Sequence, residues 1–234
     1  MKNLILASTS TVHGGSYLEY LKPTLNEHFK AVERIIFIPY ARPGGISHEL
    51  YTSNAQKFFN SLDIEVVGLH SFKDPVKALE HAEGVFTGGG NTFLLVKQLY
   101  ENKIIAALRD RLYQDMPYLG TSAGTNIVGV SMQNTNDMPI VHPPSFETLG
   151  TVPFNINAHY LDPDPTSKHM GETRETRIKE FHHFNNVPVI GLREGSWIEV
   201  KQRAYILRGP HSARIFEATK SPYELPTDSE ITIS

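Results

Sequence analysis

The stretch Pro117-Tyr118-Leu119-Gly120-Thr121-Ser122-Ala123-Gly124 places a short apolar run directly before a glycine-rich turn. It matches the pattern G-x-S-x-G, in which a glycine on each side lets a strand bend sharply into a helix and leaves the serine exposed. The residues that follow, 126–128, are suited to continue as a helix. The stretch therefore predicts a strand, turn and helix of an α/β protein, with Ser122 as a candidate nucleophile. The alternative is a tight turn in which Ser122 only caps the helix.

Short β-type runs alternate with helix-type segments on the N-terminal side of this turn. Continuous apolar runs predict the strands, and apolar residues three or four positions apart predict the helices between them. Such alternation is typical of a parallel sheet with crossover helices. The expected strands are 3–7, 34–39, 64–67, 84–87 and 117–120, and the expected helices are 18–29, 48–62, 75–82 and 92–114.

The C-terminal half is less regular. Residues 134–157 are rich in Pro, Asn and Thr, and we expect them to form loops over the carboxyl edge of the sheet, where ligands bind in open α/β folds. A helix is expected over 171–184, followed by strands and hairpins between 187 and 218. Because no repeat or linker separates these segments, we predict one α/β domain over 1–234, with a mostly parallel sheet and helices on both faces. The last residues, 221–234, are interpreted as a flexible tail.

The composition excludes several classes of function. A chain of 234 residues with 40% apolar and 20% charged residues is typical of a soluble globular protein. Its net charge of -3 gives no reason to expect nucleic acid or an acidic membrane surface as a partner. Without cysteine, a thiolate cannot serve as nucleophile or metal ligand. The N-terminal apolar run is too short for a signal peptide, and no later run approaches the ~20 residues of a membrane span, so we expect a cytoplasmic protein.

A serine nucleophile needs a base within hydrogen-bond reach and a third group that orients this base. Among the eleven histidines, His159 is the best candidate base because it closes the apolar run 152–158 and would project from a strand end. Two acids compete to orient it. Asp137 would give the Ser, Asp, His order of α/β-hydrolases, whereas Glu194 follows an apolar strand near the C-terminus. Both acids remain candidates at this point.

The triple glycine 88–90 follows an expected strand and precedes an expected helix, so its backbone N–H groups could converge on an anion. The phosphate-binding patterns of P-loops and dinucleotide folds are not matched. We interpret the segment as part of an oxyanion hole, in which an N–H group of Gly89 or Gly90 acts together with that of Ala123. The alternative is that the glycines only allow close packing.

No metal or cofactor is expected. His48-Glu49 begins like the helix of a zinc protease, but Thr52 stands where the second histidine is needed. The adjacent pair His182-His183 would point to different sides of a helix and cannot chelate an ion together. We expect a monomer or a weak homodimer that acts on a small molecule.

These residues together resemble the peptidase E family of aspartyl dipeptidases. The matching segments occur in the family's order and at its approximate spacing, and they extend over most of the chain. They are Gly88-Gly89-Gly90-Asn91-Thr92-Phe93, Ser122-Ala123-Gly124, Thr135-Asn136-Asp137-Met138-Pro139-Ile140-Val141, Asn157-Ala158-His159, Gly171-Glu172-Thr173-Arg174 and Gly191-Leu192-Arg193-Glu194-Gly195. Thr125 and the Pro-rich run 162–165 depart from the family's pattern.

The resemblance implies a flavodoxin-like or class I glutamine amidotransferase-like sheet and a serine-type dipeptidase that cleaves Asp-X dipeptides through an acyl-enzyme. It implies Ser122 as nucleophile, His159 as general base, and Glu194 or Asp137 as the acid behind it. It also implies that Arg174 receives the substrate's side-chain carboxylate, which a guanidinium can bind bidentately. Two alternatives stay open. One is a cyanophycinase-like peptidase that cuts β-linked aspartyl-arginine, and the other is a noncatalytic flavodoxin-like domain that binds an anion.

Overall fold

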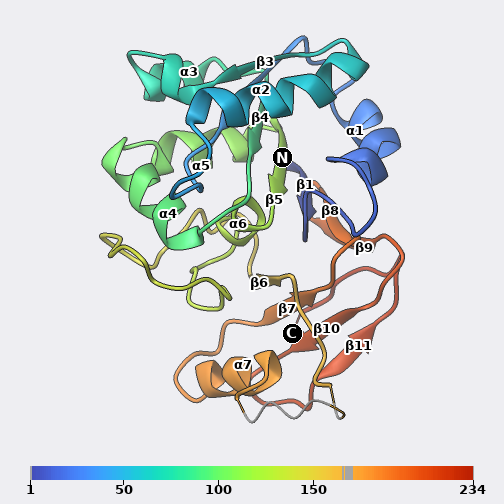
Figure 1. Ribbon diagram of the computed structural model, residues 1–234. Helices are drawn as coiled ribbons and strands as arrows, with labels where there is room; N and C mark the ends of the chain where they lie inside the picture. The colour runs from blue at the N-terminus through green and yellow to red at the C-terminus, as the bar shows by residue number, and fades with distance from the viewer. Residues whose placement is uncertain (1, 165, 167–170, 234) are drawn as a thin grey trace.

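A computed structural model describes residues 2–164, 166 and 171–233 of the chain. Its main sheet has seven strands, in the order β3-β2-β4-β5-β1-β8-β9 (Figure 1). The first five are parallel to one another, and the last two add an antiparallel edge next to β1. These strands are β1 (Asn3–Ala7), β2 (Arg34–Ile38), β3 (Glu65–Gly68), β4 (Gly84–Thr87), β5 (Pro117–Thr121), β8 (Trp197–Lys201) and β9 (Ala204–Arg208).

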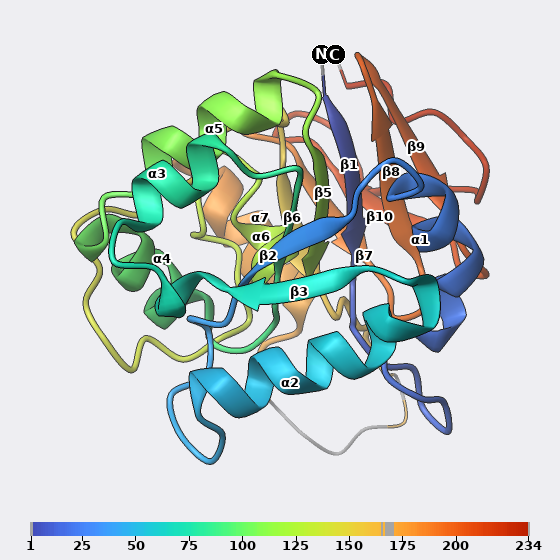
Figure 2. The same ribbon diagram turned by 90° about the horizontal axis from the view of Figure 1, so that it is seen from above.

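Helices cover both faces of the main sheet (Figure 2). On one face, α1 (Lys22–His28) and α2 (His48–Phe59) bury their apolar side chains against the strands. On the other face lie α3 (Pro75–Glu80), α4 (Thr92–Glu101), α5 (Ile105–Tyr113) and the short α6 (Ala123–Asn126). Local sequence sets several helix starts, since the side chains of Ser47 and Asn91 accept backbone N–H groups at the beginnings of α2 and α4. The prediction of a mostly parallel α/β sheet with helices on both faces is confirmed.

A second sheet of four strands lies beyond the carboxyl edge of the main sheet (Figure 1). It contains β6 (Asn155–Ala158), β7 (Val189–Leu192), β10 (Ala213–Phe216) and β11 (Tyr223–Leu225), in the order β11-β10-β7-β6. The helix α7 (Arg174–His182) packs on it through Ile178. One buried apolar cluster contains side chains from both sheets, so the two share a core. The sequence indicated strands in this region but not their assembly into a separate sheet.

The segment 221–234, interpreted from the sequence as a tail, contains part of this second sheet. β11 pairs with β10, and the backbone N–H of Ile231 donates to the carbonyl of Tyr205 at 2.7 Å. Ser234 lies outside the described residues. In the described part of the chain, no helix combines the length and the apolar character needed to cross a membrane.

Candidate active site

Ser122 occupies the turn between β5 and α6 in a backbone conformation that non-glycine residues seldom adopt, with φ 53° and ψ -111°. Its N–H donates to the carbonyl of Ala7 at 3.1 Å, which ties the turn to the end of β1. Gly124 lies against the neighbouring strand, where a Cβ would be only 2.1 Å from the carbonyl oxygen of Thr87. The side chain of Ser122 makes no capping hydrogen bond to α6, so the turn presents the hydroxyl instead of using it for the helix.

A chain of hydrogen bonds joins Ser122 to His159 and Glu194. The Nε2 atom of His159 lies 2.9 Å from the Oγ atom of Ser122, and the Nδ1 atom lies 2.5 Å from the Oε1 atom of Glu194. A carboxylate can only accept a hydrogen bond, so Nδ1 donates to Glu194 and Nε2 is left to accept from the serine hydroxyl. This is the arrangement of nucleophile, base and orienting acid that serine hydrolases use.

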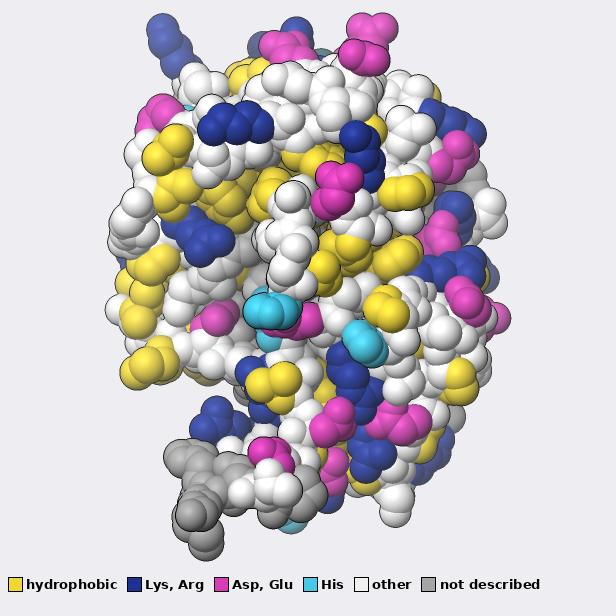
Figure 3. Space-filling model, turned by 45° about the vertical axis from the view of Figure 1, so that its right-hand side comes forward, with side chains coloured by type: hydrophobic (Ala, Val, Ile, Leu, Met, Phe, Trp, Pro, Cys, Tyr) yellow, Lys and Arg dark blue, Asp and Glu magenta, His cyan; other side chains and the backbone are white. Residues whose placement is uncertain are grey.

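The base and the acid both come from the second sheet. His159 directly follows β6 in a left-handed conformation, with φ 56°, and Glu194 follows β7, the parallel neighbour of β6. The side chains of His159 and Glu194 are 34% and 48% exposed, so a dissolved substrate can reach them. Figure 3 shows histidine and acidic side chains close together near the middle of the molecule.

Asp137, the other candidate acid, lies at the start of α4. Its Oδ2 atom accepts the backbone N–H of Thr92 at 2.7 Å and the hydroxyl of Thr135 at 2.9 Å. An acid at this position satisfies a free N–H group at a helix N-terminus and interacts favourably with the helix dipole. The structure thus brings Glu194, and not Asp137, into contact with His159.

The candidate oxyanion donors lie beside the serine. Gly89 packs so closely on the turn that a Cβ there would be 3.0 Å from the Cβ of Ser122. Within the described part of the chain, the N–H groups of Gly89, Gly90 and Ala123 have no hydrogen-bond acceptor, whereas that of Gly88 donates to Ile38. Free backbone N–H groups next to a nucleophile are suited to stabilise a tetrahedral oxyanion, and Gly89 and Ala123 lie next to Ser122.

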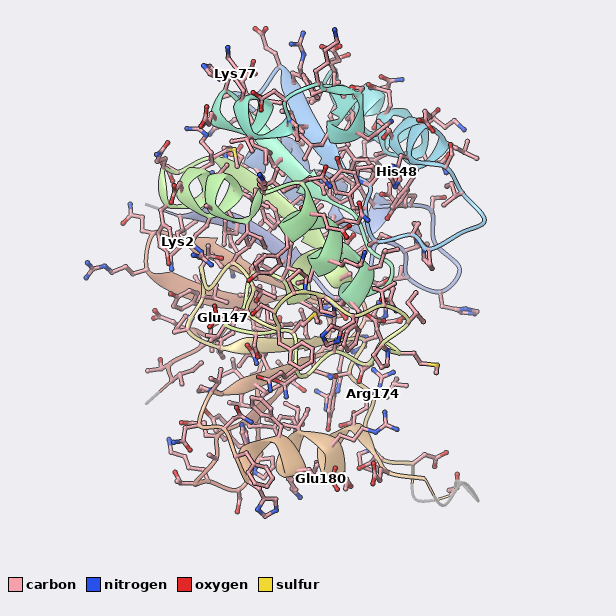
Figure 4. All side chains as sticks on the ribbon, turned by 90° about the vertical axis from the view of Figure 1, so that its left-hand side faces the viewer. Lys2, His48, Lys77, Glu147, Arg174 and Glu180 are labelled. Carbon is pink, nitrogen blue, oxygen red and sulfur yellow. The ribbon has the colours of Figure 1, made fainter. Side chains whose placement is uncertain are left out.

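Arg174 begins α7 on the side toward the main sheet (Figure 4). Burial lowers its pKa and the charge of Arg177 lowers it further, whereas the charges of Glu194 and Tyr160 raise it. Its Nη1 atom is buried and has no hydrogen-bond partner among the described residues. A buried donor without a partner is costly, and an anionic group bound next to it would remove that cost.

A cavity of about 540 Å³ opens beside Glu194, within the usual size range of small-molecule sites. It is lined by Val12, His13, Tyr20, Glu194, Gly195, Trp197, Gly209, Pro210 and His211.

In the described ranges, no group of three or more His, Cys, Asp or Glu residues could hold a metal ion.

Two polar residues that the sequence reasoning did not select also belong to this region. Ser8 directly follows β1 and accepts the backbone N–H of His159 at 2.8 Å. The hydroxyl oxygen of Thr125 lies 2.6 Å from the carbonyl oxygen of Ala7 and 2.8 Å from that of Gly120, and its single proton can donate to either, which holds the serine turn in place. The available signal for Ser8 was its position, because a polar residue at the carboxyl end of a central strand lies where α/β proteins build their sites.

Comparison with known proteins assigns the chain to a family. The model of peptidase family S51 matches residues 4–207. Peptidase E of Streptomyces coelicolor is 47% identical over 230 residues, covering 98% of this chain and 93% of the relative. A Drosophila melanogaster protein named "Probable alpha-aspartyl dipeptidase" is 43% identical over 234 residues, covering 99% and 96%. A crystal structure of a peptidase from an acI-B1 Actinobacterium has a TM-score of 0.71 at 15% identity and covers 100% of this chain and 97% of that one, which supports the fold alone. The resemblance noted in the sequence is confirmed, and the chain belongs to peptidase family S51.

Proposed function

We propose that this peptidase is a serine-type dipeptidase that hydrolyses dipeptides with an N-terminal aspartate through an acyl-enzyme. The observation that carries the proposal is the hydrogen-bonded chain of Ser122, His159 and Glu194 at the carboxyl edge of the main sheet. The names of the Streptomyces and Drosophila relatives, peptidase E and alpha-aspartyl dipeptidase, support the substrate class.

The proposed reaction follows the chemistry of a serine hydrolase. His159 takes the proton of Ser122 as its Oγ atom attacks the peptide carbonyl, and Glu194 stabilises the imidazolium that forms. The N–H groups of Gly89 or Gly90 and of Ala123 hold the oxyanion of the tetrahedral intermediate. His159 then gives its proton to the leaving amine, which leaves an aspartyl ester on the serine. Water activated by the same histidine hydrolyses that ester and restores the enzyme.

Arg174 supplies the preference for aspartate in this proposal. Its half-buried guanidinium has an Nη1 atom without a hydrogen-bond partner among the described residues, and the charge of Glu194 raises its pKa, which supports a place for the substrate carboxylate near the catalytic groups. Desolvation strengthens a charge-assisted bond between a guanidinium and a carboxylate. A substrate with a neutral side chain would leave the Arg174 guanidinium without a partner, so such a substrate would be disfavoured.

A substrate panel tests this function directly. We expect turnover of Asp-X dipeptides, weaker turnover of Glu-X, and none of X-Asp, because only Asp-X offers the carboxylate at the required distance from the scissile bond. Preferred cleavage of β-linked aspartyl-arginine would favour a cyanophycinase-like function instead. An absence of hydrolysis in the whole panel, together with binding of a simple anion, would favour a noncatalytic domain.

Replacing Arg174 with methionine should lower kcat/KM for Asp-X dipeptides by roughly 10- to 100-fold, the range expected for a lost hydrogen bond to a charged group. Methionine keeps most of the length of the side chain and removes the charge. Steady-state kinetics with Asp-X and with an uncharged X-X dipeptide give the ratio of specificities. Arg177→Met is the matched control on the same helix, since Arg177 is exposed and pairs with Glu172 at 3.7 Å. An equal loss of kcat/KM in Arg174→Met and Arg177→Met would contradict the proposed role of Arg174 in binding the substrate carboxylate.

We further propose that the chain is one domain, a monomer or weak homodimer, and cytoplasmic, with neither nucleic acid nor membrane as a partner. The core shared by the two sheets supports a single unit. We expect a single cooperative thermal transition, a sedimentation mass near 26.3 kDa and recovery with the cytoplasmic fraction.

A further inference from the structure

Ser8 is a fully buried residue at the junction of the two sheets. It directly follows β1, and its hydroxyl makes two hydrogen bonds, both 2.8 Å long. It donates to the carbonyl of Leu192, the last residue of β7, and it accepts the backbone N–H of His159. A serine hydroxyl has one proton to donate, so the donor and acceptor roles of Ser8 are both defined by these neighbours.

The contacts of Ser8 lie on both sides of the orienting acid. Its backbone N–H donates to the carbonyl of Ser196 at 3.1 Å, while its hydroxyl binds Leu192. Glu194 lies midway between these two residues in the chain. Ser8 therefore holds both ends of the short segment that carries Glu194, in addition to the backbone of His159.

The nucleophile Ser122 is hydrogen-bonded to Ala7, the residue that precedes Ser8. The carbonyl of Ala7 accepts the N–H of Ser122 at 3.1 Å and the hydroxyl of Thr125 at 2.6 Å. Ala7, the last residue of β1, thus contacts the backbone of Ser122. Ser8, the next residue, contacts the backbone of His159 and both ends of the segment that carries Glu194. Nucleophile and base come from different sheets, and this junction is where their relative position is set.

The backbone of His159 requires such support. Its φ of 56° lies in the left-handed region, which a non-glycine residue adopts only when its surroundings hold it there. The neighbouring N–H groups are held as well: that of Ala158 donates to the side chain of Asn126 at 3.3 Å, and that of Tyr160 to the carbonyl of Leu192 at 3.1 Å. The bond from His159 to Ser8 is the central one of the three and the shortest.

We propose that Ser8 is a positioning residue, whose buried hydroxyl holds the backbone of His159 so that the Nε2 atom meets the hydroxyl of Ser122. The proposal rests on the function proposed above for the Ser122, His159 and Glu194 chain. The side chain of Ser8 contacts only the backbone of its neighbours, so Ser8 acts through the histidine and through the segment that carries Glu194, the acid that orients this histidine. The effect of its loss should therefore appear in the chemical step and leave substrate binding intact.

The expected result for Ser8→Ala is a fall in kcat of about 10- to 100-fold with KM for Asp-X changed by less than about 2-fold, because a shift of roughly 1 Å in a catalytic group costs rate at that scale. Ser8→Cys keeps a side chain of similar size but a poorer donor, and it should show a smaller loss in the same direction. Thr148→Val is the control for removing a buried hydroxyl, since Thr148 is buried and donates to the carbonyl of Gly129 at 2.7 Å. All rates are expressed per folded enzyme, measured by circular dichroism.

A double-mutant cycle with His159→Ala separates positioning from a general structural role. If Ser8 acts through the imidazole, Ser8→Ala lowers the residual rate of the His159→Ala enzyme by less than about 2-fold, although it lowers the wild-type rate strongly. A general loss of structure would lower both rates by the same factor. Equal factors in the two backgrounds, or full kcat in Ser8→Ala, would overturn the proposal.

A second readout keeps this inference distinct from the substrate assignment. Labelling of Ser122 by a fluorophosphonate requires the nucleophile and its base but no aspartyl group. If the wild-type enzyme is labelled yet cleaves no Asp-X dipeptide, the proposed substrate is wrong, and Ser8 is still tested by the labelling rate. Slower labelling of Ser8→Ala than of Thr148→Val supports the positioning role, and equal rates contradict it.

Discussion

Ser122→Ala is expected to reduce the turnover of Asp-X dipeptides by about 10⁶-fold, the scale seen when the nucleophile of a serine hydrolase triad is removed. The hydroxyl is the attacking group, and no cysteine exists in the chain that could replace it. Alanine fits the same turn, because the backbone of Ser122 is held by Ala7 and the side chain does not cap α6. The residual rate is measured from the product formed after a long incubation with Asp-X dipeptides.

Ser53→Ala is the matched control for this variant, since Ser53 is exposed on the surface of α2. Both proteins should melt within a few degrees of the wild type, as is usual for substitutions that leave no cavity or unpaired group. Activity retained in Ser122→Ala above a hundredth of the wild-type rate would contradict the nucleophile assignment, and with it the acyl-enzyme route.

Glu194→Gln should lower kcat by about 10³- to 10⁴-fold, while changing KM little. The amide can still occupy the place of the carboxylate, but it carries no charge to stabilise the imidazolium, and it can present an N–H group to the Nδ1 atom of His159. That would favour the wrong tautomer, with Nε2 protonated and unable to accept from Ser122. Steady-state kinetics at saturating Asp-X provide the measurement.

Asp137→Asn is the counterpart of this experiment. We expect kcat within about 3-fold of the wild type, together with a loss of about 1 kcal/mol in stability, or roughly 2–4 °C in Tm, because Asp137 holds the N-terminus of α4 through Thr92. A calorimetric melt and the same kinetic assay distinguish the two effects. If Asp137→Asn lost more turnover than Glu194→Gln, the acid of the triad would have been misassigned.

The main sheet could be predicted because its signals are local. The strands β1, β2, β4 and β5 of the parallel region are short, mostly apolar runs in which at most the first residue is not buried, and capping residues such as Ser47 and Asn91 mark the helix starts. The turn at Ser122 could be predicted for the same reason, since a Cβ at Gly120 would be only 2.5 Å from the carbonyl oxygen of Gly124, four residues further along the same turn. These features depend on neighbours in the sequence or on backbone sterics alone.

The choice between the two acids could not be made in this way. Asp137 and Glu194 both lie in loops or near strand ends at the carboxyl edge of the sheet. The order of residues along the chain gives no physical reason to prefer either acid. What distinguishes them is the pairing of β6 with β7, which puts Glu194 beside His159. That pairing joins segments separated by more than 30 residues, and no local pattern encodes it.

By itself the sequence determined the α/β class, the sharp turn at Ser122, the histidine at a strand end and the family resemblance, because backbone sterics, apolar periodicity and segment order are properties of the chain alone. Only the tertiary structure decided that a second sheet exists, that Glu194 rather than Asp137 meets His159, and that Ser8 joins the two sheets at the site. The reason is physical: hydrogen bonds of 2.5 to 2.9 Å between residues 35 to 151 positions apart depend on how sheets pack. Packing is decided by the whole core and not by any one segment.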